Sequence, residues 1–200
     1  MATMSQCQRQ RLPCFSLVAK DLLDLEKHFE FYGAYHSNPA NVVIHSLFIW
    51  PIFYTSLILC HFTTPIFFLP AWLGGEVLAL DLGFVFVVML GLFYVSMDRK
   101  AGSLAAVLCI LCWIGSGCLA SQLGFSLAWK VVLAAQLLCW TAQILGHLLF
   151  EKRAPALLDN LVETLLTAPF FVLLEVLKNI CGYEPYPGFH ASVKVKIEDA

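Results

Sequence analysis

The sequence predicts an all-α protein, a polytopic bundle of membrane helices, from its composition and from the length of its apolar runs. Apolar residues make up 60% of the chain and charged residues 13%, and the mean hydropathy is +0.77. Soluble domains carry about 25% charged residues. The apolar runs extend over about 20 residues, the length of a spanning helix, whereas strands of membrane barrels alternate over about ten. The net charge of -2 is too small to indicate a nucleic-acid partner.

The chain opens with polar sequence that leads into a predicted amphipathic helix. Residues 1–20 lack periodicity and any signal-peptide pattern, so we expect a flexible N-terminal segment without a cleaved signal. From Asp21 onward, apolar residues recur at helical spacing between charged ones, which predicts an amphipathic helix on the membrane surface. In the segment HSNPAN, Asn38 can cap a helix whose first turn begins at Pro39.

Four apolar runs are predicted to span the membrane. Their approximate limits are Val42–Phe62, Leu82–Met97, Ser103–Ser121 and Leu127–Phe150. Prolines and glycines in Pro65–Leu80 indicate a kinked or interfacial hairpin there. The apolar stretch Leu161–Leu177 is broken by two glutamates and a proline, which favours a re-entrant or interfacial helix. Residues 21–183 are therefore predicted to form one membrane-embedded domain, followed by a C-terminal tail at 184–200.

Basic residues predict the orientation of these spans. Lysines and arginines precede the first span, join the second to the third and follow the fourth. Because cytoplasmic loops carry an excess of Lys and Arg, the N-terminus and the loop after the fourth span should both be cytoplasmic. Two polar clusters, residues 31–45 and 146–155, would then meet at one membrane face.

These two clusters contain the candidate site. Three histidines and a carboxylate on one face can hold a metal, and this donor set without cysteine suits non-haem iron(II), Fe(2+), better than structural zinc. The candidates are His36, His45, His147 and Glu151, with Asn38, Asn41 and Gln143 as orienting residues around them. The alternative is that each histidine only forms hydrogen bonds across the bundle or lies at headgroup level.

The other histidines and the cysteines are expected to have no part in the site. His28 and His61 are predicted to be surface or headgroup histidines, and His190 lies in the predicted tail. Most cysteines fall inside apolar runs, so we expect no disulfides. The CxxC of Cys109 and Cys112 lies within a span without a second pair, which argues against a zinc or redox site there.

Two stretches of the chain resemble a known enzyme family. FYGAYHSNPANVVIH and AQILGHLLFEKRAPALLDNLVETLLTAPFF are similar to the 2-hydroxy fatty acid dioxygenases of fungi, plants and bacteria. The similarity covers roughly Leu25–Tyr183, and its paired motifs are H-x-N-P-x-N-x-x-x-H and G-H-x-x-F-E-K-x-x-P-A.

The resemblance implies an iron(II) enzyme of the endoplasmic reticulum membrane that acts in fatty acid α-oxidation after phytosphingosine degradation. Its substrates would be O2 and a long-chain 2-hydroxy fatty acid, and its products CO2 and the acid one carbon shorter, with membrane lipid as a further partner. The family's histidines correspond to His36, His45 and His147, whereas Ser37 stands where some relatives have a further histidine. Glu151 or a substrate oxygen would then complete the metal shell.

Two basic residues follow the predicted fourth span and lie near the candidate site in the sequence. Lys152 and Arg153 would meet the substrate carboxylate at headgroup level, or would serve only as positive anchors of the span. A non-catalytic bundle that binds lipid or scaffolds other proteins would use the same polar clusters to cap and anchor helices.

Overall fold

The computed structural model describes residues 23–199 except 69, 71, 73–78 and 156–160, so the predicted flexible segment at 1–20 lies outside the described residues. Its helices are α3 Leu25–Tyr35, α4 Pro39–Cys60, α5 Leu82–Met97, α6 Arg99–Gly146, the π-helix η2 His147–Glu151, α7 Leu161–Cys181 and α8 Phe189–Asp199. Two two-residue strands, β1 Phe67–Phe68 and β2 Ala79–Leu80, pair antiparallel in the predicted hairpin between α4 and α5. The all-α class is confirmed.

The beginning of α4 is fixed by local chemistry. Asn38 is the N-cap, and its side-chain oxygen accepts a hydrogen bond from the backbone amide of Ala40 at 2.9 Å. Pro39 follows at the first helical position, where its missing amide proton costs nothing. The predicted start is therefore confirmed, and the 22 residues of α4 extend about 33 Å, enough to cross a bilayer.

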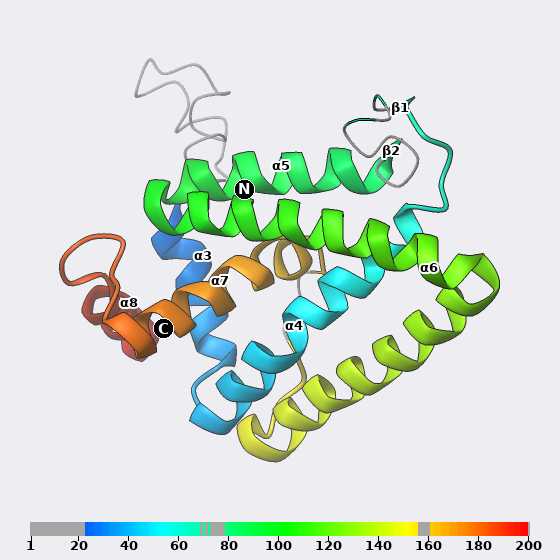
Figure 1. Cartoon of the computed structure of the whole chain (residues 1–200). Helices are drawn as coiled ribbons and strands as arrows, with labels where there is room; N and C mark the ends of the chain where they lie inside the picture. Colours follow the sequence, from blue (N-terminus) through cyan, green and yellow to red (C-terminus); the bar gives the residue numbers. More distant parts are fainter. Residues whose placement is uncertain (1–22, 69, 71, 73–78, 156–160, 200) are drawn as a thin grey trace, which may run out of the picture.

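Helix α6 is bent into two arms at Gly124. The dihedral angles of Gly124 are φ 62° and ψ 162°, a region that is essentially restricted to glycine. Residues 99–123, the first arm, run beside α5, and residues 125–146, the second arm, return toward the start of α4 (Figure 1). The bend falls between the predicted spans Ser103–Ser121 and Leu127–Phe150.

Three helices among the described residues are long and apolar enough to cross a membrane. They are Pro39–Cys60, the bent segment Arg99–Glu151, and Thr164–Cys181. At 16 residues, α5 is shorter than a full span, so the predicted number of four spans is not confirmed. The interfacial depth of α7 stays a prediction. Large apolar side chains on the outer faces of α4, α5 and α6 are exposed, as expected of surfaces that face lipid.

The apolar core is centred on α7. Phe170 and Phe171 are completely buried, and the ring of Phe170 stacks on Tyr94 of α5 with centroids 5.1 Å apart. Phe29 of α3 meets Phe171 edge to face at 5.3 Å. The apolar face of α3, expected on the membrane surface, is therefore buried inside the protein.

The C-terminal segment also differs from its prediction. Residues 189–199 form α8, which packs on α3 instead of trailing as a tail. Phe189 is completely buried with its ring centroid 5.2 Å from that of Phe29, and His190 lies 5.7 Å from the same ring. The burial of Phe189 explains why this polar segment is held against the domain.

Candidate metal centre

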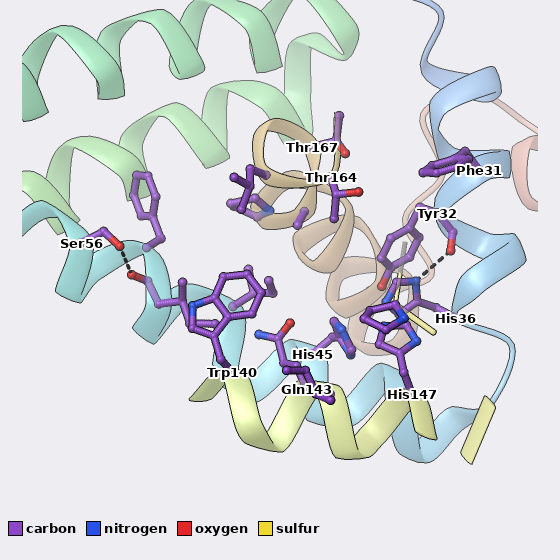
Figure 2. Close-up of a pocket in the computed structure, with 18 of the residues that line it drawn as sticks. Phe31, Tyr32, His36, His45, Ser56, Trp140, Gln143, His147, Thr164 and Thr167 are labelled. Carbon is purple, nitrogen blue, oxygen red and sulfur yellow. Dashed lines mark hydrogen bonds between the residues drawn. The ribbon is translucent and has the colours of Figure 1, made fainter. Parts of the chain in front are cut away.

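Three histidines from separate elements form one cluster. His36 follows α3, His45 lies in the second turn of α4, and His147 begins η2. The ring centroids are 4.4 Å apart for His36 and His45, 5.0 Å for His36 and His147, and 4.8 Å for His45 and His147 (Figure 2). One nitrogen from each ring lies within 4.8 Å of the others. The structure thus brings together the histidines of two clusters that are distant in the sequence.

Backbone carbonyls orient two of the three rings. His36 Nδ1 lies 2.8 Å from the carbonyl oxygen of Tyr32, and His45 Nδ1 lies 3.0 Å from that of Asn41. Because a carbonyl oxygen only accepts hydrogen bonds, each Nδ1 must carry the proton, which leaves Nε2 with a free lone pair. Histidines that bind metals usually donate the other ring N–H in this way.

Two nitrogen atoms of the cluster are buried without a partner. His36 Nε2 and His147 Nδ1 make no hydrogen bond with any described residue. An unsatisfied buried polar group costs about 1–3 kcal/mol, so a ligand that pairs with both would be strongly favoured. Burial and the nearby ring of His45 lower the pKa of His36 well below 6.5, which keeps it in the neutral form that binds metals. Three imidazoles without cysteine can hold a divalent metal ion, and iron(II) is among those that imidazole suits.

Glu151 joins the end of η2 to the beginning of α4. Its carboxylate accepts hydrogen bonds from Ser37 Oγ at 2.6 Å, from the backbone amide of Asn38 at 2.9 Å and from Asn41 Nδ2 at 3.1 Å. These three contacts hold the turn between His36 and α4 against the helix that carries His147. The role of Glu151 as a metal ligand stays a prediction.

A π-helix and a glycine set the approach of His147 to His45. The sequence predicted regular helix to Phe150, but η2 winds residues 147–151 as a π-helix, a local irregularity that is frequent at functional sites. A Cβ atom on Gly146 would lie 2.6 Å from Asn41 Oδ1. Glycine at this position therefore lets the second arm of α6 lie directly against α4.

The two basic residues after η2 do not line the cavity described next, although burial and, to a smaller extent, the nearby charge of Arg153 lower the pKa of His36. Arg153 donates a hydrogen bond to the carbonyl oxygen of Ala34 at 2.8 Å, and its guanidinium covers the ring of Tyr35 at 3.7 Å. Lys152 has a positive φ of 54° and is exposed. Their part in substrate binding stays a prediction.

An elongated cavity of about 570 Å³ opens on the histidine cluster. It extends along α4 from the histidines toward Ser56, between the second arm of α6 and the beginning of α7 (Figure 2). Its walls are mainly apolar, with Ile49, Phe53, Phe86, Trp140, Ile144 and Leu165 among them. None of the described residues that line it is Lys, Arg, Asp or Glu. Volume and lining are those of a site for an apolar ligand with a small polar end.

Comparison with known proteins decides the family. Residues 22–180 match the family model described as 2-hydroxy-palmitic acid dioxygenase Mpo1-like. The chain belongs to the Mpo1-like family. It is 33% identical over 168 residues to the 2-hydroxy-palmitic acid dioxygenase MPO1 of Saccharomyces cerevisiae, covering 84% of this chain and 87% of the yeast protein. No solved structure matches.

Tyr32 lines the cavity but was not predicted from the sequence as a site residue. It lies one turn before His36 on α3, and the two rings stack with centroids 4.1 Å apart and planes at 16°. Its hydroxyl group is buried, and no described residue pairs with it. Burial raises the pKa of Tyr32 well above 10, so the hydroxyl keeps its proton. The spacing of four residues from His36 was the available signal.

Gln143 occupies the corresponding place on α6. It lies one turn before His147, lines the cavity and is 5% exposed. Its Nε2 is buried without a hydrogen-bond partner in the described part of the chain. Asn41, likewise four residues before His45, is instead bound to Glu151. The structure therefore brings Gln143 to the cavity, as predicted for a residue around the site, while Asn38 and Asn41 organise its edge.

The prediction for His61 is wrong. Its side chain is 6% exposed, and Nδ1 lies 2.7 Å from Asp81 Oδ2. Nε2 lies 3.0 Å from Ser116 Oγ and 3.1 Å from the carbonyl oxygen of Trp113. His61 is thus part of a buried polar cluster that connects the end of α4 with the beginning of α5 and with the first arm of α6.

Proposed function

We propose that this protein is an iron(II)-dependent dioxygenase that shortens long-chain 2-hydroxy fatty acids by one carbon. The observation that carries the proposal is the cluster of three imidazoles, two buried and one partly buried, with unpaired nitrogens at the end of an apolar cavity. Membership in the Mpo1-like family supports the substrate class, since the yeast relative is a 2-hydroxy-palmitic acid dioxygenase.

The proposed reaction needs no reductant other than its substrate. One 2-hydroxy acid and one O2 give one shorter acid, one CO2 and one water. The bond between C1 and C2 breaks, and these two carbons together lose the four electrons that O2 gains. No 2-oxoglutarate is therefore required. When bound, iron(II) supplies the redox chemistry for the reduction of O2.

Each part of the site has a task in this proposal. His36, His45 and His147 hold the iron, and the carbonyl oxygens of Tyr32 and Asn41 keep two of the rings in the required tautomer and orientation. The apolar cavity takes the acyl chain and keeps water away from the reacting carbons. We place the protein in the endoplasmic reticulum membrane, with its N-terminus and the histidine cluster on the cytoplasmic side, because of the resemblance and the distribution of basic residues.

Anaerobic reconstitution with iron(II), followed by O2 and 2-hydroxypalmitate, tests the proposal. We expect about one iron per chain, and pentadecanoate and CO2 as products. Single alanine substitutions at His36, His45 and His147 should each lower turnover more than about a hundredfold, because even residues that only orient metal ligands contribute 10–100-fold. His28→Ala is the matched control, since His28 does not line the cavity.

The same experiment separates the enzyme from a non-catalytic bundle. A protein that only binds lipid would take up the 2-hydroxy acid without retaining iron or forming product. Turnover that persists in all three alanine variants would show that the histidine cluster is not the site.

A further inference from the structure

Three buried hydrogen-bond donors in the wall of the cavity have no partner among the described residues, the hydroxyls of Tyr32 and Thr164 and the side-chain amide of Gln143. Tyr32 and Gln143 each precede a histidine of the cluster by four residues. Figure 2 shows both side chains directed into the space that His36, His45 and His147 border. Buried donors are normally paired, so these two indicate an acceptor that enters with the ligand.

Among the described residues, none that lines the cavity offers a Lys or Arg side chain to an incoming carboxylate. The lining contains imidazoles, hydroxyls, one amide and apolar groups, and the nearby Arg153 is bound to Ala34 and Tyr35. Within the described lining, the groups that can bind a carboxylate are therefore neutral N–H and O–H donors, beside any metal held by the histidines. A carboxylate only accepts hydrogen bonds, and bonds to an ionised acceptor are about twice as strong as neutral ones.

The two donors also have equivalent sequence spacings from histidines of the cluster. Tyr32, on α3, precedes His36 by four residues and stacks on its ring with centroids 4.1 Å apart, and Gln143, on α6, precedes His147 by four residues. At this spacing, side chains of a helix lie on one face, so each donor flanks one of the histidines from a different wall. Asn41 has the same spacing from His45, but its amide is bound to Glu151.

We propose that Tyr32 and Gln143 bind the carboxylate of the 2-hydroxy acid, so that neutral donors and not Lys152 or Arg153 recognise the head group. This inference rests on the proposed function for the identity of the ligand. The hydrogen bonds orient C1 and C2 toward the histidine cluster and direct the acyl chain along the apolar part of the cavity. Tyr32 and Gln143 thereby select acids over esters and alcohols of equal chain length.

Equilibrium binding without O2 tests the proposal independently of turnover. The affinities of 2-hydroxypalmitate and of its methyl ester are measured for wild type, Tyr32→Phe and Gln143→Leu in lipid nanodiscs, with iron loaded anaerobically and without metal. Each variant should bind the acid about tenfold more weakly, the effect of one lost charge-assisted hydrogen bond. Affinity for the uncharged ester should change less than about twofold. Iron content should be unchanged, because Phe keeps the ring that stacks on His36.

Control variants and opposite outcomes make the test decisive. Tyr54→Phe and Gln122→Leu change the same side chains outside the cavity and should leave both affinities as in wild type. Equal losses for acid and ester would mean that Tyr32 and Gln143 only support the cavity wall, and would overturn the proposal. So would a loss of acid preference in Lys152→Met but not in Tyr32→Phe. Acid preference that depends on both donors in a protein without turnover would support this inference while rejecting the proposed function.

Discussion

The two ends of α4 carry two histidine clusters with opposite character. The first, which we call the open cluster, consists of His36, His45 and His147. It has buried nitrogens without a partner in the described chain and opens on a cavity. The second, which we call the closed cluster, consists of His61, Asp81, Ser116 and Trp113. In it both ring nitrogens of His61 face hydrogen-bond partners, and Asp81 Oδ1 also accepts from the amide of Phe84 at 2.9 Å and from Trp113 Nε1 at 3.3 Å.

The closed cluster shows that residue types alone do not make a catalytic site. His61 lies between Ser116 and Asp81, the order of a serine hydrolase triad. However, Ser116 is completely buried, lines no cavity described in the protein, and donates its hydroxyl proton to the carbonyl oxygen of Trp113 at 2.9 Å. Buried polar groups that have hydrogen-bond partners connect helices. Buried polar groups that lack a partner and lie beside a cavity indicate a ligand.

The largest contrast between the clusters is expected from Asp81→Ala. This change removes the partner of His61 and the N-cap of α5, and should lower the free energy of unfolding by about 3 kcal/mol. Iron content and turnover per folded molecule should stay as in wild type, because the histidine cluster lies at the other end of α4. Denaturation in detergent, followed through Trp fluorescence, measures the first effect, and metal analysis measures the second.

The opposite result would remove the distinction between the clusters. If Asp81→Ala lost iron but kept its stability, the two ends of α4 would be coupled and the closed cluster would belong to the site. Asp199→Ala, at the end of α8, is a suitable control for the loss of a carboxylate elsewhere.

The next effect, on the open cluster, is expected from Glu151→Gln. The neutral amide presents an N–H group to at least one of the donors from Ser37, Asn38 and Asn41, so the turn between His36 and α4 should loosen. Iron affinity, measured by competition with a chelator, should fall about 10–100-fold, as for other residues that orient ligands. Glu198→Gln, at an exposed ion pair with Lys194, should change nothing. Complete loss of iron would favour Glu151 as a ligand itself.

Much of this architecture could be predicted because it depends on neighbours in sequence. Asn38 and Pro39 define the start of α4 through local capping, and the apolar runs define helices through their length. The distribution of basic residues and the opposite directions of the first and fourth predicted spans predicted that the histidines meet. The structure brings them together, although the number of spans is not confirmed. The bend at Gly124 lies in the gap left between two runs.

The rest depends on pairs of residues that are distant in the sequence. His61 contacts Asp81 and Ser116 only because the end of α4 meets the beginning of α5 and the first arm of α6. An isolated histidine after an apolar run gives no sign of these contacts. Glu151 reaches α4 through the π-helical winding of η2, which no spacing rule for α-helices describes. The burial of α3 against α7 depends on Phe171, more than a hundred residues further along the chain.

A smaller effect is expected from adding a methyl group where the helices approach closely. In Gly146→Ala the new Cβ would meet Asn41 Oδ1 at 2.6 Å, so α4 and the second arm must separate. Overpacking should lower stability by about 1–2 kcal/mol and should weaken iron binding, since His45 and His147 lie on the two helices that move apart. Thermal unfolding and chelator competition measure the two effects.

Gly115→Ala is the matched change on the first arm of α6. There a Cβ would meet only the side chain of Tyr54, at 3.3 Å, and the higher helix propensity of Ala should offset the crowding. Equal losses of iron affinity in Gly115→Ala and Gly146→Ala would show that general destabilisation, and not helix separation at the site, causes the loss.

The smallest effect concerns the pH dependence of iron binding. An imidazole must be neutral to bind a metal, so affinity is constant above the pKa of the ligands and falls as the pH drops through it. Burial lowers the pKa of His36 below its ordinary 6.5, which moves this fall to lower pH than for exposed histidines. Chelator competition should therefore give constant affinity from about pH 7.5 to 6.5 and a decrease only below about pH 6. A decrease in iron affinity that begins above pH 6.5 would contradict this prediction. It would mean that the histidines of the open cluster are protonated in the metal-free protein and must lose protons to bind a metal.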